Sequence, residues 1–246
     1  MDNLPSSNSR YKDRNYWDER YHHEETYEWF GAFSRFEHLL KEEIRSDETI
    51  LVLGCGNSSL SYEMFMSGYR SITNIDFSAI CIEKMASKYA TCSGMEWKIM
   101  DAKALEFENE SFDVVLEKGT LDAMMVDEKD PWNVSEETIE TIDQVLKEVS
   151  RVLRKGGRFI SITFAQPHFR KQLYAKRDYK WSIKHQTYGS DFHYHFYTMT
   201  KGENLSSDDQ ELENKCSQIA EPQATVYLQI TENEDYLNNI EYKFAN

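Results

Sequence analysis

The chain has 246 residues and a formal net charge of -15, so it is long enough for one domain with a full core and has no excess of cations for a nucleic-acid backbone. Its four cysteines form no CxxC pair, which argues against zinc and redox motifs and favours reduced thiols in the cytoplasm. No apolar run approaches the roughly 20 residues of a membrane span, and the polar start is unlike a signal peptide. We therefore expect a cytoplasmic protein without a metal site that acts on neither nucleic acid nor membrane.

The N-terminal part of the chain is polar and then aromatic. Residues 1–14 are polar and are expected to be mobile, ahead of a single domain over 15–246. Trp17 and Tyr21 stand four positions apart, which on a helix places both rings on one face. For 15–48 this pattern predicts either an amphipathic helix that caps the core or a helical lid that excludes water from a bound cofactor.

The stretch that ends at Asp76 has the order strand, glycine turn, helix, strand and acid. An apolar run over 50–53 predicts a buried parallel strand, and it breaks into small residues over 54–58, where backbone can approach a ligand closely. Apolar residues at helical spacing follow, and a second strand runs up to Asp76. This order is typical of a nucleotide-binding βαβ unit whose terminal acid accepts hydrogen bonds from ribose hydroxyls.

The details of the glycine turn restrict the cofactor. A dinucleotide fingerprint needs a third glycine at the position of Ser59, and a phosphate-binding P-loop needs a Gly-Lys-Ser/Thr ending that this turn lacks. These differences favour a cofactor that has a ribose but no pyrophosphate. The alternative is a βαβ unit that binds no ligand.

Two later strand ends also carry polar residues. The third predicted strand is followed by Asp101, which could meet an adenine amino group or cap the next turn. The fourth is followed by the sequence EKGTLD, which contains Glu117, Lys118 and Asp122. This cluster indicates either a site beside the first strand or a charged loop in which Asp122 caps the next helix.

The rest of the chain continues the alternation of helices and strands. The predicted elements are a helix over 78–89, strands over 95–100, 112–116 and 158–164, a helix over 139–155 that ends at Gly156-Gly157, two strands over 181–188 and 193–200, a linker or mobile loop over 202–222, and a short strand over 224–230. His193 and His195 would share one strand face, and without a third ligand this pattern favours ordinary sheet surface over a metal site.

Several segments together resemble one protein family. YWDERY, LVLGCGNSSLS, NIDFS, MDA, FDVVLEKGTLDAM and GGRFISITFAQPHFR look like the small eukaryotic methyltransferases of the elongation factor 1-alpha lysine methyltransferase type. They resemble in particular the form whose domain also occurs fused ahead of endothelin-converting enzyme 2, and the likeness spans roughly residues 15–200. The resemblance implies an α/β, Rossmann-like class I methyltransferase sheet of seven strands, in the order 3-2-1-4-5-7-6, with strand 7 antiparallel and helices on both faces.

The resemblance also implies a reaction and a cofactor site. The reaction is methyl transfer from S-adenosyl-L-methionine to a lysine of elongation factor 1-alpha, and we expect the enzyme to be a monomer. Gly54 would approach the methionine part of the cofactor, and the EKGTLD motif, which holds Lys118, is required for activity in the family. The residues implied to contact the cofactor are Trp17, Tyr21, Trp29, Gly54, Asp76, Phe77, Asp101, Ala102 and Lys118.

The chemistry of this reaction limits what the enzyme must supply. The cofactor brings its own leaving group, so the protein mainly positions two reactants and needs no covalent nucleophile. We therefore assign Glu117 or Asp122 to the capture and orientation of the lysine, and count both with Lys118 as catalytic candidates. The charge of -15 suits a substrate with a basic surface. The alternatives are a small-molecule methyltransferase and a catalytically silent cofactor-binding partner protein.

Overall fold

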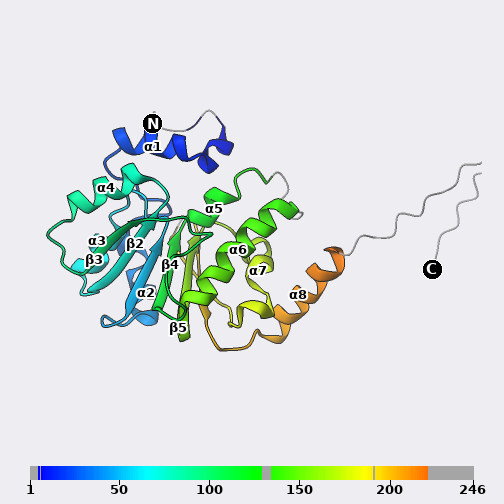
Figure 1. Cartoon of the computed structure of the whole chain (residues 1–246). Helices are drawn as coiled ribbons and strands as arrows, with labels where there is room; N and C mark the ends of the chain where they lie inside the picture. Colours follow the sequence, from blue (N-terminus) through cyan, green and yellow to red (C-terminus); the bar gives the residue numbers. More distant parts are fainter. Residues whose placement is uncertain (1–4, 6, 129–133, 191, 221–246) are drawn as a thin grey trace, which may run out of the picture.

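The computed structural model describes residues 5, 7–128, 134–190 and 192–220 (Figure 1). Their strands form one sheet that lies between helices, and helix α1 (Arg14–His23) lies across one end of it. Within these ranges, every helix is too short or too polar to cross a lipid bilayer.

The sheet has seven strands in the order β3-β2-β1-β4-β5-β7-β6. Neighbouring strands are parallel, except that β7 is antiparallel to both β5 and β6. The predicted fold class, strand order and direction of strand 7 are therefore confirmed. The strands are β1 (Thr49–Leu53), β2 (Ser71–Asp76), β3 (Met95–Ile99), β4 (Phe112–Lys118), β5 (Leu153–Thr163), β6 (Lys184–Tyr188) and β7 (Tyr194–Thr200).

Both faces of the sheet are covered, as the unbroken apolar runs of its central strands predict. In β1, Leu51 and Leu53 share a hydrophobic core with residues of α6 and α7, whereas Ile50 and Val52 share another with residues of α2 and α3. Besides α1, the helices are η1 (Asn8–Lys12), η2 (Phe33–Arg35), α2 (Glu37–Glu43), α3 (Leu60–Met66), α4 (Ala79–Lys88), α5 (Thr120–Met124), α6 (Glu136–Val152), α7 (Pro167–Tyr174), η3 (Arg177–Tyr179) and α8 (Ser207–Ala220).

The carboxyl ends of β1, β2 and β4 meet at the edge of the sheet that α1 covers (Figure 1). Leu53 at the end of β1 pairs with Ile75 on one side and with Glu117 on the other. The glycine turn after β1, Asp76 at the end of β2 and Lys118 at the end of β4 are therefore brought together. In open α/β sheets this switch point is where ligands bind.

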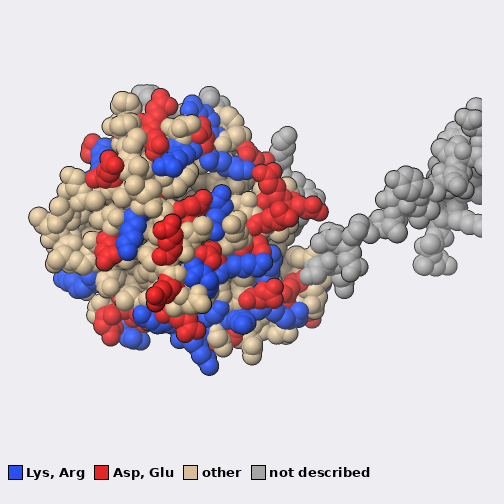
Figure 2. Space-filling view, in the orientation of Figure 1, with Lys and Arg blue, Asp and Glu red and all other residues tan. Residues whose placement is uncertain are grey.

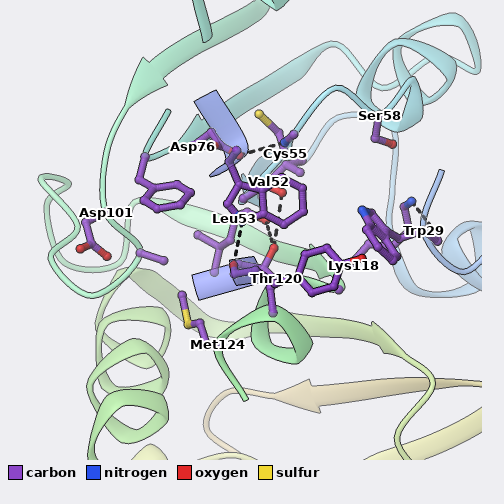
Figure 3. Close-up of a pocket in the computed structure, with 18 of the residues that line it drawn as sticks. Trp29, Val52, Leu53, Cys55, Ser58, Asp76, Asp101, Lys118, Thr120 and Met124 are labelled. Carbon is purple, nitrogen blue, oxygen red and sulfur yellow. Dashed lines mark hydrogen bonds between the residues drawn. The ribbon is translucent and has the colours of Figure 1, made fainter. Parts of the chain in front are cut away.

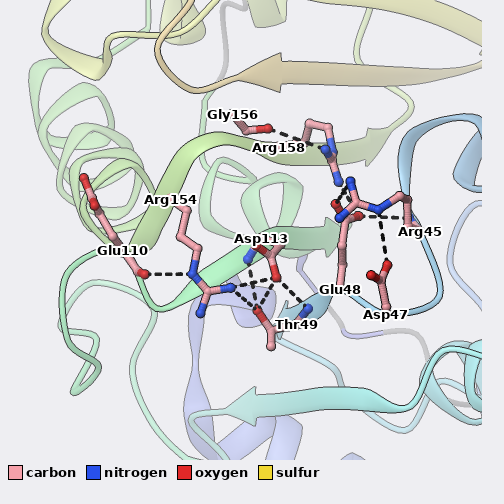
Figure 4. Close-up of polar contacts among 9 residues, drawn as sticks. All are labelled: Arg45, Asp47, Glu48, Thr49, Glu110, Asp113, Arg154, Gly156 and Arg158. Atoms are coloured by element: carbon pink, nitrogen blue, oxygen red, sulfur yellow. Dashed lines mark hydrogen bonds and ion pairs between the residues drawn. The ribbon is translucent and has the colours of Figure 1, made fainter.

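The opposite edge of the sheet is tied together by ion pairs (Figure 4). Asp113 Oδ2 accepts hydrogen bonds from Thr49 N at 2.9 Å and from Arg154 Nη1 at 2.7 Å. Glu48, whose side chain is only 4% exposed, pairs with Arg158. These contacts join β1, β4 and β5, the strands whose other ends carry the candidate site.

The boundary between α6 and β5 differs from the prediction. The helix ends at Val152 and the strand begins at Leu153, so the prediction that Gly156-Gly157 ends the helix is wrong. Leu153 pairs with Phe112, and the register then shifts before pairing resumes at Arg158. The glycines lie within this shift, where Gly156 has φ 79°. Strand pairing therefore stops the helix before the glycines are reached.

The segment 202–222, predicted as a linker or mobile loop, contains helix α8. Ser206 Oγ accepts a hydrogen bond from Asp209 N at 3.2 Å, which caps the start of the helix. Asp209 also pairs with Lys171 of α7 at 2.8 Å. The prediction is wrong here because this polar, acidic segment is stabilised by an ion pair with α7, which is distant in the sequence. The strand predicted over 224–230 lies outside the described residues.

Part of the N-terminal segment is also structured. Residues 8–12 form η1 within the stretch predicted as mobile. Trp17 Nε1 donates a hydrogen bond to Tyr11 O at 2.7 Å, and the Tyr11 ring lies edge-on to Trp29 with ring centroids 5.6 Å apart. These aromatic contacts supply order that polar composition does not predict.

Candidate functional site

The carboxyl ends of the central strands line a cavity of about 320 Å³, which we call the first cavity (Figure 3). The sheet and α1 bring its lining together from distant parts of the chain. Tyr11, Thr120 and Met124 also line it and were not predicted, although the EKGTLD motif pointed to the region of Thr120. Every residue predicted to contact the cofactor lies on this cavity: Trp17, Tyr21, Trp29, Gly54, Asp76, Phe77, Asp101, Ala102 and Lys118.

The glycine turn is shaped by its neighbours. Gly54 has φ +56°, and a Cβ built there would lie 2.4 Å from Thr120 Oγ1. That hydroxyl donates a hydrogen bond to Leu53 O at 2.9 Å, so α5 is fastened directly against the turn. A side chain at Gly54 would separate the two elements and narrow the first cavity.

Asp76 is a buried acid fixed at the end of β2. Its Oδ2 accepts a hydrogen bond from Gly56 N and its Oδ1 from Ser78 N, each at 3.0 Å. Burial raises the pKa of Asp76 to about 6, and the two backbone bonds only partly oppose this rise. The carboxyl is thus held in one orientation and is short of donors, which suits an acceptor for hydroxyl groups.

Aromatic rings form the roof of the first cavity. Trp17 and Tyr21 stack with ring centroids 5.5 Å apart, and Trp29 lies edge-on to Trp17. The guanidinium of Arg20 sits over the Trp17 and Trp29 rings, and its Nε donates to Glu24 at 2.9 Å. The predicted face of Trp17 and Tyr21 therefore both packs against the protein and covers the cavity.

An ion pair joins the roof to the floor of the cavity. Lys118 Nζ donates to Glu28 Oε2 at 3.0 Å and to Trp29 O at 2.8 Å. Glu28 also accepts hydrogen bonds from Ser58 Oγ at 2.8 Å and from Ser59 N at 2.5 Å. Burial lowers the pKa of Lys118 despite its partner. Glu28 was not predicted, because its partners lie far away in the sequence and no local spacing marks it.

Glu117 does not reach the first cavity. Its side chain is fully buried, and it accepts hydrogen bonds from Thr120 N at 3.0 Å, Leu121 N at 3.3 Å and Ser161 Oγ. Burial raises the pKa of Glu117 to about 7, and the nearby Asp122 adds to the rise. The expectation that Glu117 captures a substrate lysine is therefore corrected: this carboxyl caps α5 from beneath.

Asp122 lines a different cavity of about 580 Å³, which we call the second cavity. Its Oδ1 accepts hydrogen bonds from Thr163 Oγ1 and from Arg170 Nη2, both at 2.6 Å. The N-cap position of α5 is Gly119, so the alternative in which Asp122 caps the next helix is wrong. Asp122 instead belongs to a buried polar cluster beside the first cavity.

Asp101 caps its own turn and also lies on the first cavity. It lines the first cavity, and its Oδ1 accepts a hydrogen bond from Lys103 N at 2.9 Å within its own turn. Its side chain is 49% exposed. Contact of Asp101 with an adenine stays a prediction.

Two groups have the composition of metal sites. Cys55, Asp76 and Cys81 are buried with potential ligand atoms within 4.8 Å of one another, and both carboxylate oxygens of Asp76 already accept backbone hydrogen bonds. His195 Nδ1 lies 2.8 Å from His185 Nε2 on the neighbouring strand, while His193 is exposed. Among the described residues, neither His193 nor His195 belongs to a group of three or more potential metal ligands.

Most of the chain is similar in sequence to known methyltransferases. Residues 44–236 match a family model described as a methyltransferase domain. "EEF1A lysine methyltransferase 4" of Mus musculus is 49% identical over 97% of this chain and 95% of its own length. The Homo sapiens "eEF1A lysine and N-terminal methyltransferase" is 39% identical over 70% of this chain but only 24% of its own length.

Solved structures share the fold at low sequence identity. Phosphoethanolamine N-methyltransferase 1 of Haemonchus contortus has a TM-score of 0.57 and 18% identity, covering 86% of this chain and 53% of that one. N-methyltransferase NodS of Bradyrhizobium japonicum has a TM-score of 0.54 and 14% identity, covering 69% and 87%. These likenesses concern the arrangement of helices and strands.

Proposed function

Because this chain belongs to the class I S-adenosylmethionine-dependent methyltransferases, in the family that includes EEF1A lysine methyltransferase 4, we propose that it methylates a lysine of elongation factor 1-alpha. The observation that carries the proposal is the near full-length likeness to the mouse and bovine proteins of that name. The names of those two proteins give the proposed substrate. The residues that line the first cavity support a methyl transfer.

The first cavity fits the cofactor. Its volume lies within the range of small-molecule sites. Asp76 offers a fixed carboxyl to ribose hydroxyls, and Gly54 leaves the backbone of the turn uncovered. Phe77, Asp101 and Ala102 line the same cavity and are assigned to the adenine end.

The remaining residues arrange the reactants and keep water away. When bound, S-adenosylmethionine supplies a methyl group on a sulfonium, which passes to the lone pair of a neutral amine as the carbon–sulfur bond breaks. Trp17, Tyr21 and Trp29 cover the cavity and exclude water. Lys118 positions this roof through its bond to Trp29 O.

Incubation of the purified chain with tritiated S-adenosylmethionine and elongation factor 1-alpha tests the proposal. We expect label on the factor, on a lysine that peptide mass spectrometry identifies, and less label with an Asp76→Ala variant at a cofactor concentration near the wild-type Kd. Label only on small molecules of a lysate would indicate a small-molecule methyltransferase. Cofactor binding without transfer to any protein of the lysate would indicate a silent binding partner.

Two further properties belong to this proposal. Elongation factor 1-alpha works in translation, so we place the reaction in the cytoplasm. We also propose that the chain acts as a monomer that meets its substrate through one face. Sedimentation of the active protein tests the second statement, because a dimer at assay concentration would contradict it.

A further inference from the structure

The second cavity adjoins the first. Tyr11, Trp17, Trp29, Gly119 and Ala123 line both cavities. At this junction Gly119 has φ +81°, and a Cβ built there would lie only 3.1 Å from the Phe30 ring. The junction is therefore kept free of a side chain that would crowd it.

We propose that the second cavity receives the lysine side chain of the protein substrate, and that Asp122 Oδ2 accepts a hydrogen bond from its amine. This inference rests on the proposed function, since it takes lysine to be the methyl acceptor. Beyond the proposed function, it states from which side the substrate approaches the first cavity and which groups recognise the substrate lysine.

The two carboxylate oxygens of Asp122 differ in their hydrogen bonding. Its Oδ1 is bonded to Thr163 and Arg170, whereas its Oδ2 is buried and has no hydrogen-bond partner in the part of the chain that the structure describes. The side chain is only 8% exposed. A buried acceptor without a partner is costly, and an amine that donates to it would remove that cost.

The charges around the second cavity favour a cation. Its charged lining residues are Asp122, Glu128 and Arg170, one more acid than base. Arg170 is already matched by Asp122 at 2.6 Å. Glu128 accepts hydrogen bonds from Ser135 N and Ser135 Oγ at 2.9 and 2.6 Å, which leaves Asp122 as the acid with a vacant acceptor.

The walls suit the apolar stem of a lysine. Trp29, Phe30, Phe164, Phe169 and Phe192 line the second cavity, and methylene groups of lysine pack well on such surfaces. Phe164 and Phe192 are 52% and 56% exposed, which is unusual for large apolar side chains.

The exposed aromatic rings also continue into a surface groove. Trp29, Phe30, Phe164 and Phe192 line both the second cavity and this groove, whose volume is about 370 Å³. The groove gives the backbone on either side of the lysine a place to lie. A protein segment fits this arrangement better than a small molecule, which would not need a groove outside the cavity.

The first experiment compares steady-state kinetics on elongation factor 1-alpha. Asp122→Asn keeps the shape of the side chain and removes the charge, and we expect KM for the factor to rise about tenfold or more while the cofactor Kd stays unchanged. Phe164→Ala and Phe192→Ala should raise KM without lowering thermal stability. Met66→Ala removes a similarly exposed apolar side chain, 63% exposed and outside these cavities, and is the matched control.

The second experiment does not depend on the substrate or on activity. n-Butylammonium carries the stem and charge of a lysine side chain, and saturation-transfer NMR should show that it binds the wild type but not Asp122→Asn, with 1-butanol as the neutral control. If the wild type does not methylate the factor, the proposed function fails, and this binding still decides the role of the cavity. Equal binding of n-butylammonium to both proteins would overturn the inference, as would unchanged KM in all three cavity variants.

Discussion

Asp76 places a carboxylate on the first cavity, where we assign it to the ribose hydroxyls of the cofactor. Both of its oxygens already accept a backbone N–H, yet the group stays poorly solvated. We expect Asp76→Ala to weaken S-adenosylmethionine binding by about 1.5–3 kcal/mol, because the ribose hydroxyls lose a charged acceptor. Isothermal titration calorimetry measures the change, with Asp47→Ala, an exposed acid at the far edge of the sheet, as the control. Equal cofactor affinity of wild type and Asp76→Ala would contradict the assignment.

The raised pKa of Asp76 also predicts a pH dependence of stability. Between its ordinary value of 3.8 and about 6, the folded state keeps a proton that the unfolded state has released. The contribution of Asp76 to stability is therefore present at low pH and is lost as the pH rises through this window. Without cofactor, the free energy of unfolding of the wild type should fall relative to Asp76→Asn between about pH 4 and 6, then run parallel to it. Urea titrations check this, and a constant difference would contradict it.

The two acids of the EKGTLD motif show where residue-level prediction stops. Sequence predicts that Glu117 and Asp122 follow a central strand, but not which way each side chain points. Gly119 turns the chain with φ +81°, so Glu117 stays beneath α5 while Asp122 lies on the second cavity. That turn, and not the spacing of the acids, decides their separate roles.

At the scale of elements, the roof of the first cavity depends on Glu28. Glu28→Gln would remove the carboxylate that pairs with the buried Lys118 and weaken the hydrogen bond to Ser59 N. We expect cofactor to dissociate about tenfold faster, the size of a lost charge-assisted hydrogen bond. Stopped-flow tryptophan fluorescence measures the rate. Glu25→Gln is the matched control: Glu25 is 78% exposed and pairs with Lys84 at the surface, where ion pairs contribute little. Equal rates for the two variants would contradict a role for Glu28.

The elements themselves were predictable to different degrees. The central strands follow from apolar runs, and the resemblance supplied their order, so the residues at their carboxyl ends could be assigned to one site. Helix α8 and the start of β5 could not be predicted in the same way. Each depends on a partner outside its own segment: Lys171 for α8 and Phe112 for β5.

At the scale of the whole molecule, charges of both signs are mixed on the visible surface and in the first cavity alike. Figure 2 shows Lys and Arg interspersed with Asp and Glu over one face. The charged lining of the first cavity is likewise balanced, with Lys12, Lys103 and Lys118 against Asp76, Asp101 and Glu137. Residues 221–246 hold five acids and one lysine. These residues therefore contribute -4 to the net charge of -15.

This distribution gives a test of electrostatic steering. We expect the specificity constant on elongation factor 1-alpha to fall as salt rises, because attraction of a basic surface is screened beyond about 8 Å at physiological salt. Steady-state kinetics at several salt concentrations, on the full chain and on a chain that ends before Glu232, separate two sources of the effect. If the shorter chain loses the salt dependence and Asp122→Asn keeps it, the acidic residues from Glu232 onward steer the substrate and Asp122 does not.

The order in which the ribosome makes the chain bears on helix α1. The carbonyls of Tyr21 and Glu24 accept hydrogen bonds from Lys84, and Glu28 accepts one from Lys118, so the roof is synthesised long before its anchors. Helix α1 is polar enough to remain in water until the sheet has formed. An element that docks last onto a finished sheet can also undock without disturbing it. Cofactor exchange would then cost the protein the packing of Tyr16, Trp17 and Tyr21 against residues of α4, and leave the cores on both faces of the sheet folded.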